Sequence, residues 1–442
     1  MKLLKTHYIF IIFIFVAFIV RIFLAVLLLQ PQFKENDDLA RYRDWGKISY
    51  YHGVSDSYNL KHISFGINPN NQPPGTTYID FAMYSAYETI FHTPPENQLK
   101  LYDIFLKFPS ILADLIIGIL IYFCVSKYTK KKYALLAMSL FIYNPVVIYN
   151  STVWGQTDAI NNLLLYCSIL FLLSKKYFLT IFTFFLCLYI KISLLPLLPL
   201  ILLLTLKETK YNYKKIFVFT ITSIIALLLF TLPVSNSPLI WIINFLKQNS
   251  SGELQHIANY SFNFWSLIFN PDSFSLVPLS SSLVLGISLE VWAYLLFFLA
   301  FIPLFIYVIK NKTLSAIQIF GIYSITTFAM FLFLPRMHER YLYPVIPLLA
   351  TYVGLKGKNY LEFLLVSLLN FIGLYIVWHP SNFLPTLITG IIVHSKVRLG
   401  MSVLIVALFI LLYIQIVLGK NKLLPILSFK KFRKRQSSIK DV

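Results

Sequence analysis

The chain has 442 residues, of which 58% are hydrophobic and only 13% charged, and its mean hydropathy is +0.71. Many apolar runs reach about twenty residues, which is the length that crosses the hydrocarbon core of a bilayer as a helix. The composition therefore excludes a soluble globular protein and predicts an all-α polytopic membrane protein. The net charge of +20 does not indicate nucleic-acid binding, because the lysines and arginines gather in short clusters between the apolar runs.

The first predicted span covers about residues 8–29, and Lys2 and Lys5 before it place the N-terminus in the cytoplasm. The polar segment 30–101 that follows is then outside. A turn of a few residues would connect two spans, so a loop of this size predicts a task. Within it, residues 38–51 carry apolar side chains at helical spacing, which predicts a helix on the membrane interface.

The middle of the chain alternates between short spans and basic clusters. Spans are predicted over about residues 102–125 and 133–150, and a further one ends at Lys175. Residues 177–206 lie between two basic clusters, which predicts a hairpin of two thin spans with Lys191 near its outer bend. A single long tilted helix is the alternative, and it would invert the topology of everything downstream.

The remaining spans bring the predicted total to about twelve, within a range of ten to thirteen. They are expected near residues 216–233, 286–309, 314–334, 341–355, 360–377 and 401–418, with a second outer loop over 234–285 and an interfacial piece over 384–393. Residues 1–419 form one transmembrane domain, and residues 420–442 form a basic cytoplasmic tail. The absence of an internal repeat disfavours a transporter, because many transporter folds are built from repeated halves.

The predicted topology places the polar motifs together on the outer face, although it was derived from the basic residues alone. These motifs are Asp37 and Asp38, residues 71–75, residues 154–158, Lys191, residues 263–265 and residues 336–340. Random loop polarity would scatter them over both faces, so their convergence predicts a site.

The run from Arg336 to Arg340 has two arginines flanking a His-Glu pair. The planar guanidinium of arginine gives bidentate, charge-assisted bonds to phosphate. His338 adds a further donor, which Glu339 can orient. The alternative is an interfacial charge cluster without a ligand.

Asp38 follows the first span at the boundary between water and membrane. A carboxylate there can act as general base toward a hydroxyl group. It can equally cap the predicted interfacial helix, because aspartate is favoured at that position. The two roles are compatible if Asp37 caps the helix and Asp38 faces inward.

Other ionisable residues within the apolar runs are expected to be structural. Asp103 and Lys107 stand four residues apart in the order that favours an ion pair on a helix. Arg21 and Asp114 are expected to pair between helices, because a charge in lipid needs a partner.

Four further positions on the outer face have two interpretations each. Lys191 would meet a phosphate at the hairpin bend, or be structural. Asp158 can cap the helix that it begins, whose N-terminus would itself attract an anion. Trp45 and Trp265 near the mouth could stack on a sugar ring, whereas most aromatic residues of the chain are expected to face lipid.

Five stretches together resemble a known family. They are Asp38-Leu39 with Tyr42 and Trp45; Pro73-Pro74-Gly75; Lys107, Pro109 and residues 111–115; Asn144-Pro145 through Trp154-Gly155-Gln156 and Asp158; and Arg336 through Tyr341 with Pro344. In this order they resemble the bacterial relatives of the second GPI mannosyltransferase, polytopic glycosyltransferases of the GT-C class, and Asn263-Phe264-Trp265 is a weaker sixth match. The chain departs from the family pattern at Asn71-Gln72, where Asp-Tyr is common, and at Ile192-Ser193, where Pro-Gln is common.

The resemblance implies a GT-C-like helical bundle with interfacial helices in the first outer loop. It implies an inverting enzyme that moves a mannose-like hexose from a polyprenyl-phosphate sugar to a lipid-linked or cell-envelope glycan. The reaction would take place on the outer face of a bacterial plasma membrane, with both termini cytoplasmic.

The same resemblance assigns roles to residues. Asp38 would be the catalytic base, and Arg336, His338, Arg340 and Lys191 would bind the donor phosphate. The supporting residues would be Asp37, Trp45, Trp154, Gln156, Asp158, Asn263, Glu339 and Tyr341. No cofactor is expected, with a divalent metal on Asp37, Asp38 and Asp158 as the alternative.

Two other functional classes compete with this interpretation. A flippase or transporter of lipid-linked saccharides would carry its charges along the bundle interior, without an essential acid on a large loop. A glycan polymerase would use lipid-linked oligosaccharide as both donor and acceptor. In each case the partners are membrane lipids and saccharides rather than nucleic acid.

Overall fold

The structure, a computed structural model, describes residues 2–28, 38–59, 69–251, 255–259, 261–269, 277–378 and 386–417. The first-half helices are α1 (Lys2–Leu27), α2 (Asp38–His52), η1 (Val54–Tyr58), α3 (Pro74–Phe91), η3 (Pro95–Gln98), α4 (Leu99–Tyr128), α5 (Lys131–Ile142), α6 (Pro145–Ile148), the π-helix η4 (Tyr149–Trp154) and α7 (Asp158–Leu173). The later helices are α8 (Tyr177–Ile190), η5 (Ile192–Leu197), α9 (Leu198–Glu208), α10 (Tyr213–Thr231), α11 (Pro238–Ser251), α12 (Trp265–Ile268), α13 (Leu289–Lys310), α14 (Ala316–Phe333), η7 (Glu339–Leu342), α15 (Val345–Lys356), α16 (Tyr360–Val377), α17 (Thr386–Val393) and α18 (Ser395–Val417). Two small sheets pair β1 (Ala258–Asn259) with β4 (Met337–His338) and β2 (Ser282–Val284) with β3 (Ile287–Ser288).

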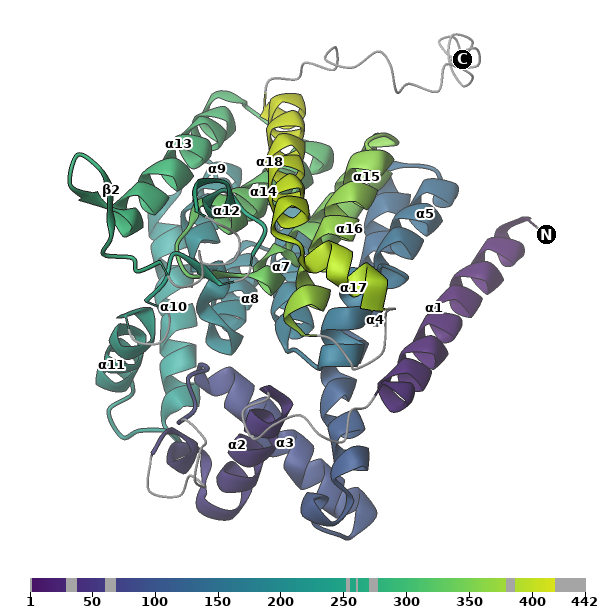
Figure 1. The fold of residues 1–442 in the computed structure, drawn as a ribbon, viewed down its shortest axis with the longest axis vertical. Helices are drawn as coiled ribbons and strands as arrows, with labels where there is room; N and C mark the ends of the chain where they lie inside the picture. Colours follow the sequence, from purple (N-terminus) through teal and green to yellow (C-terminus); the bar gives the residue numbers. More distant parts are fainter. Residues whose placement is uncertain are drawn as a thin grey trace.

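The molecule is a helical bundle in which α14 and α15 form the buried centre (Figure 1). Ser315 opens α14 with a capping box to Gln318, and Gly357 in the left-handed conformation closes α15. The helices α2 and α3 gather at one end of the bundle, away from the first residues of α1 and the end of α18.

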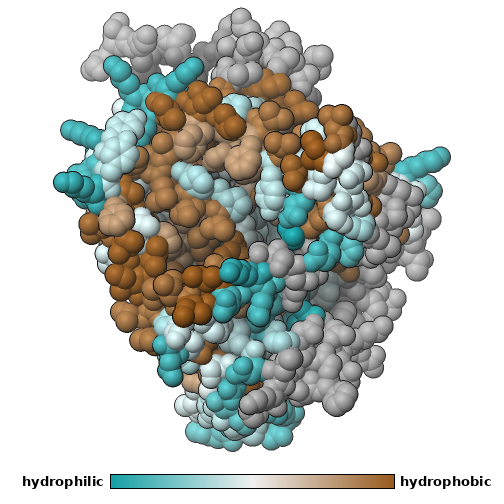
Figure 2. Space-filling model, turned by 90° about the vertical axis from the view of Figure 1, so that its left-hand side faces the viewer, coloured by the Kyte–Doolittle hydropathy of each residue, from teal (hydrophilic) through white to brown (hydrophobic). Residues whose placement is uncertain are grey.

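The helical, apolar architecture confirms a polytopic membrane protein. Within the described residues, seven helices are long and apolar enough to cross a bilayer, or eight if α5 and the bent segment after it count as one span. From the side on which Figure 1 places α10, α11 and α13, hydrophobic residues form a broad band between hydrophilic upper and lower ends (Figure 2).

The predicted count of ten to thirteen spans is not reached. The difference arises because several apolar segments are shorter than a span: α8 has 14 residues, α9 has 11 and α15 has 12. Such helices lie partly inside the bundle, where a neighbouring helix rather than lipid satisfies their apolar surface.

The predicted hairpin over residues 177–206 is confirmed in its direction. The Tyr177 hydroxyl at the start of α8 donates to the Glu208 carbonyl at the end of α9, over 3.3 Å. The chain therefore reverses between them, at Lys191, and does not continue as one long helix. Lys207 binds the carbonyls of Val308 and Asn311, so the basic turns after α9 and α13 lie together at one end.

The predicted helix over residues 38–51 is also confirmed, as α2, whereas its place on the membrane interface stays a prediction. It packs on α3 and α4 through a cluster of buried aromatic residues: Tyr42, Trp45, Tyr84, Tyr87 and Tyr102. Rings in such edge-on and tilted arrangements bury a large apolar area and fix the position of α2.

The residues of the two predicted ion pairs make close contacts with other groups, although the charges of Lys107 and Arg21 still act on Asp103 and Asp114. Asp103 accepts from Arg43 of α2, over 2.7 Å and 2.9 Å, while Lys107 donates to the Val153 carbonyl. The long loop thus supplies a better-placed cation than the neighbouring helical turn does. In the bundle, Arg21 donates to the carbonyls of Ala17 and Ile142, and the Tyr343 hydroxyl binds Asp114.

Candidate active site

A cleft of about 780 Å³ opens where the two long loops meet the hairpin bend and the run that precedes α15. Its lining includes Asp38, Arg41, Trp45, Asn71, Lys191, Lys247, Arg336, His338, Arg340 and Tyr341. Among the lining residues that the structure describes, Asp38 is the one carboxylate, whereas lysines and arginines number five. The positive charges of this lining attract an anionic ligand and hold it next to the Asp38 carboxylate.

Asp38 is the first residue of α2 and keeps a quarter of its side chain exposed. Its Oδ2 atom accepts a hydrogen bond of 2.5 Å from Gln156 Nε2 and lies 3.5 Å from Arg340 Nη1. Burial favours the neutral acid, but Arg340 and then the Gln156 hydrogen bond outweigh it and lower the pKa of Asp38 below its ordinary value. The carboxylate is therefore ionised and available to accept a proton.

The turn after η4 sets the position of Gln156. The backbone amides of Gly155 and Gln156 both donate to the Asn150 carbonyl, over 3.1 Å and 2.9 Å. Gly155 has a φ of 87°, and a Cβ there would lie 2.2 Å from Leu39 Cδ1. Only glycine allows this turn to approach α2 so closely. Gln156 then accepts from the Tyr42 hydroxyl and presents its amide nitrogen to Asp38.

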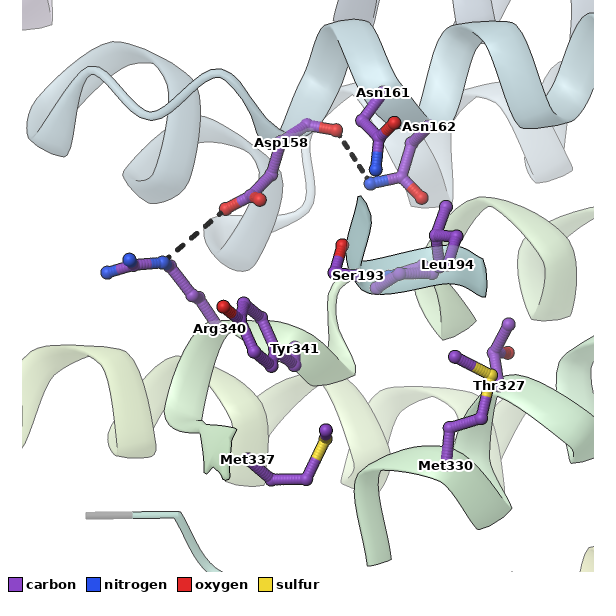
Figure 3. Close-up of a pocket in the computed structure, with 11 residues that line it drawn as sticks. Asp158, Asn161, Asn162, Ser193, Leu194, Thr327, Met330, Met337, Arg340 and Tyr341 are labelled. Carbon is purple, nitrogen blue, oxygen red and sulfur yellow. Dashed lines mark hydrogen bonds and ion pairs between the residues drawn. The ribbon is translucent and has the colours of Figure 1, made fainter. Parts of the chain in front are cut away.

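Arg340 links the carboxylates of the site. Its Nε atom lies 3.9 Å from Asp158 Oδ2, and Figure 3 marks this contact with a dashed line. The guanidinium also lies over the Trp154 ring, 5.4 Å from the ring centroid. Trp154 itself is stacked on Trp378, with the two ring planes 9° apart. Aromatic packing and ion pairs therefore hold Arg340 in one orientation.

Lys191 reaches the site from the hairpin bend and forms an ion pair with Asp158. The Pro73-Pro74-Gly75 turn fixes this bend, because Thr76 donates to the Ile190 carbonyl over 2.7 Å. A Cβ on Gly75 would lie 2.7 Å from the Tyr189 carbonyl oxygen, so the close approach requires glycine.

A small polar cavity lies behind these residues. It measures about 20 Å³, which is room for roughly one water molecule. Asp158, Asn161, Asn162, Ser193 and Thr327 contribute polar groups to its wall (Figure 3). Asn162 donates to the Asp158 backbone carbonyl over 2.7 Å, which ties the start of α7 to its next turn.

Arg336 and His338 also line the cleft. Arg336 has a φ of 61°, and its backbone amide donates to the Ile257 carbonyl where β4 begins to pair with β1. Its side chain meets Glu290 of α13 at 2.8 Å. His338 Nδ1 lies 3.7 Å from the buried Glu339 carboxylate, which is beyond hydrogen-bond distance, so the predicted orienting role of Glu339 stays a prediction.

Asn263 and Trp265 lie away from the cleft and bind the backbone at the end of α14. Asn263 donates to the Phe331 carbonyl and accepts from the Trp265 amide. Trp265 is fully buried and donates to the Phe333 carbonyl, so the prediction that it stacks on a sugar is wrong. Both residues secure the end of α14, from which the Arg336 to Arg340 run departs. Asp37 lies outside the described residues.

Sequence reasoning missed Arg41 and Lys247, which both line the cleft. Arg41 is three residues after Asp38, and residues at that spacing share a helix face, so its place could have been found. Lys247 lies in the second outer loop, where no local pattern marks it.

Comparison of the chain with protein-family models and with curated proteins finds no match. The site must therefore be interpreted from its geometry. Across the part of the chain that the structure describes, no group of three histidine, cysteine or acidic side chains is placed to hold a metal ion. The described residues of the site place an ionised carboxylate in a cleft lined by cations.

Proposed function

We propose that this protein is an inverting glycosyltransferase of GT-C type. It moves a mannose-like hexose from a polyprenyl-phosphate sugar to a lipid-linked or cell-envelope glycan on the outer face of a bacterial plasma membrane. The observation that carries the proposal is that, among the lining residues that the structure describes, Asp38 is the single carboxylate and the other charged residues of the cleft are cationic.

The chemistry needs one base and several cations. The acceptor hydroxyl oxygen attacks C1 of the hexose, and the bond between C1 and the phosphate oxygen breaks. The electron pair of that bond stays on the polyprenyl phosphate, and the hydroxyl proton passes to Asp38. Because phosphate is a good leaving group, no general acid is required.

The cations act on the leaving group. The donor phosphodiester has one negative charge, and the released polyprenyl phosphate has up to two, because its second pKa is about 6. Arg340 and Lys191 on one side, with Arg336 and His338 on the other, stabilise this growing charge more than the ground state.

Arg340 also connects donor binding to the strength of the base. Its Nη1 atom lies 3.5 Å from Asp38 Oδ2. A phosphate that draws the guanidinium toward itself weakens this contact and raises the pKa of Asp38. The carboxylate then becomes a stronger base when the donor is in place.

The test is a transfer assay with purified protein, a synthetic polyprenyl-phosphate hexose labelled with ¹³C at C1, and lipid-linked glycan acceptors. We expect a glycosylated acceptor, released polyprenyl phosphate, and an anomeric configuration opposite to that of the donor by NMR. Retention of configuration would contradict a single displacement. Movement of the intact donor across vesicles without transfer would instead establish the flippase.

A further inference from the structure

A second cavity, of about 730 Å³, adjoins the cationic cleft and differs from it in chemistry. It lies between η1, residues 69–71 and α11, and shares Asn71, Phe245 and Asn249 with the cleft. No charged residue occurs among the lining residues within the described ranges, whereas the described lining of the neighbouring cleft includes five lysines and arginines. Six of the lining side chains are amides: Asn59, Asn70, Asn71, Asn244, Gln248 and Asn249.

The helix α11 presents one face to this cavity. Trp241, Asn244, Phe245, Gln248 and Asn249 follow the spacing of residues that share a helix face. Apolar residues on the other side of α11 are exposed: Leu239, Ile240 and Ile243. The helix thus turns its amides inward and its aliphatic side chains outward, as suits a helix between lipid and a polar cavity.

Aromatic rings form part of the wall. Trp241 stacks on Phe245 with ring centroids 5.0 Å apart, and Tyr58 meets the Trp241 ring edge-on at 4.9 Å. The Tyr58 hydroxyl is held by Thr77 at 2.6 Å, and Asn70 donates to the same Thr77 at 2.8 Å. The wall is therefore a fixed frame built from the first outer loop and α11.

The lining selects the chemistry of a ligand. Side-chain amides both donate and accept hydrogen bonds, as hydroxyl groups do, and an aromatic ring suits the C–H face of a sugar. A phosphate or carboxylate would instead favour the neighbouring cations, and an acyl chain would leave the amides unpaired.

We infer that this cavity binds an uncharged saccharide and holds the sugar part of the acceptor glycan. The acceptor role rests on the proposed function, whereas saccharide binding does not. Asn71 and Asn249 line both cavities, so a saccharide seated on the amides can extend a hydroxyl toward Asp38. The donor phosphate and the acceptor sugar are thereby sorted by charge into adjoining compartments.

The test removes two amides that make no hydrogen bond within the described part of the chain, through Asn244→Ala and Gln248→Ala. Asn236→Ala, an exposed amide before α11 and outside the cavity lining, is the matched control. In the transfer assay, we expect the double variant to raise the KM for a neutral acceptor by about tenfold or more, since each neutral hydrogen bond contributes roughly threefold to tenfold. The donor KM and the control should stay unchanged.

A binding experiment separates this inference from the proposed function. Saturation-transfer NMR on the purified protein uses neutral dihexosides and trihexosides, with hexuronic-acid counterparts as charged probes. Neutral saccharides that bind the wild type and the control, but not the double variant, support the cavity even if no transfer is found. Equal binding of neutral saccharides to the double variant, or no binding of neutral saccharides to the wild type, would overturn it, whereas the charged probes are expected to bind the cationic cleft of both proteins. An unchanged acceptor KM in an active double variant would overturn the acceptor role alone.

Discussion

At the scale of single residues, the site is organised around Arg340, which lies between Asp38 and Asp158 and above Trp154. The sequence predicted Asp38, Gln156, Asp158, Lys191 and Arg340 as members of one site, and the structure brings them together. The sequence could not predict which cation contacts each acidic residue, because the partner comes from a distant element. Arg43, which pairs with Asp103, is an example.

Replacing Arg340 with alanine should lower kcat/KM for transfer by a factor of about 30 to 1,000, equivalent to roughly 2–4 kcal/mol of transition-state stabilisation. Arg340→Lys should recover only part of this, because an ammonium lacks the guanidinium fork. Steady-state kinetics with the polyprenyl-phosphate hexose measures both. Full activity in Arg340→Ala would assign the residue to structure.

The same substitution should shift the pH profile. Asp38 acts as a base only when ionised, and its pKa lies below the ordinary value of 3.8, so wild-type kcat/KM should fall only below about that pH. The charge of Arg340 is the largest cause that lowers the pKa of Asp38. In its absence, burial of the carboxylate raises that pKa. The acidic limb of the profile should therefore move to higher pH in Arg340→Ala. An acidic limb at the same pH in Arg340→Ala would show that Arg340 does not set the pKa of the catalytic base.

At the scale of elements, tight turns hold the site together. The Pro-Pro-Gly turn packs on the end of α8, and the turn at Gly155 packs on α2. Both turns were recognisable in the sequence. Their contacts with α8 and α2 were not, because such contacts involve residues that are distant in the chain. The reversal of the chain at the hairpin was predicted from the basic clusters. The amide face of α11 was not predicted, because residues 234–285 were expected to form a loop.

Gly155→Ala should destabilise the protein by roughly 1–3 kcal/mol beyond the left-handed strain itself, because its Cβ would lie 2.2 Å from Leu39 Cδ1. Gly357→Ala is the control, since Gly357 has a similar backbone conformation with nothing within 4 Å of a Cβ. Thermal unfolding in detergent compares the two. Equal losses of Tm would mean that the Gly155 contact contributes nothing.

At the scale of the whole molecule, composition was sufficient to predict a polytopic helical membrane protein. The number of spans was not predictable from hydropathy, because short helices such as α9 and α15 are apolar without crossing the bilayer as full spans. Hydropathy cannot distinguish burial in a neighbouring helix from burial in lipid.

The topology prediction is tested by cysteine labelling. In a variant without Cys124, Cys167 and Cys187, we expect a membrane-impermeant maleimide to label His52→Cys in intact cells. Lys312→Cys, at the end where the basic turns gather, should be labelled only after permeabilisation. Both positions are exposed. The reverse pattern would place the site in the cytoplasm and exclude an outer-face reaction.

The central claim is that Asp38 is the base for sugar transfer, and its most direct test is the transfer rate of Asp38→Asn. Asparagine keeps the size and caps a helix about as well as aspartate, but it cannot take the proton. Asp44→Asn, on the same helix but outside the cleft lining, is the matched control. Asp37→Asn should lower the rate less than Asp38→Asn does. We predict that Asp38→Asn lowers the rate by about a hundredfold or more while folding and donor binding persist. A near-normal rate for Asp38→Asn would contradict the mechanism and make the flippase the better account.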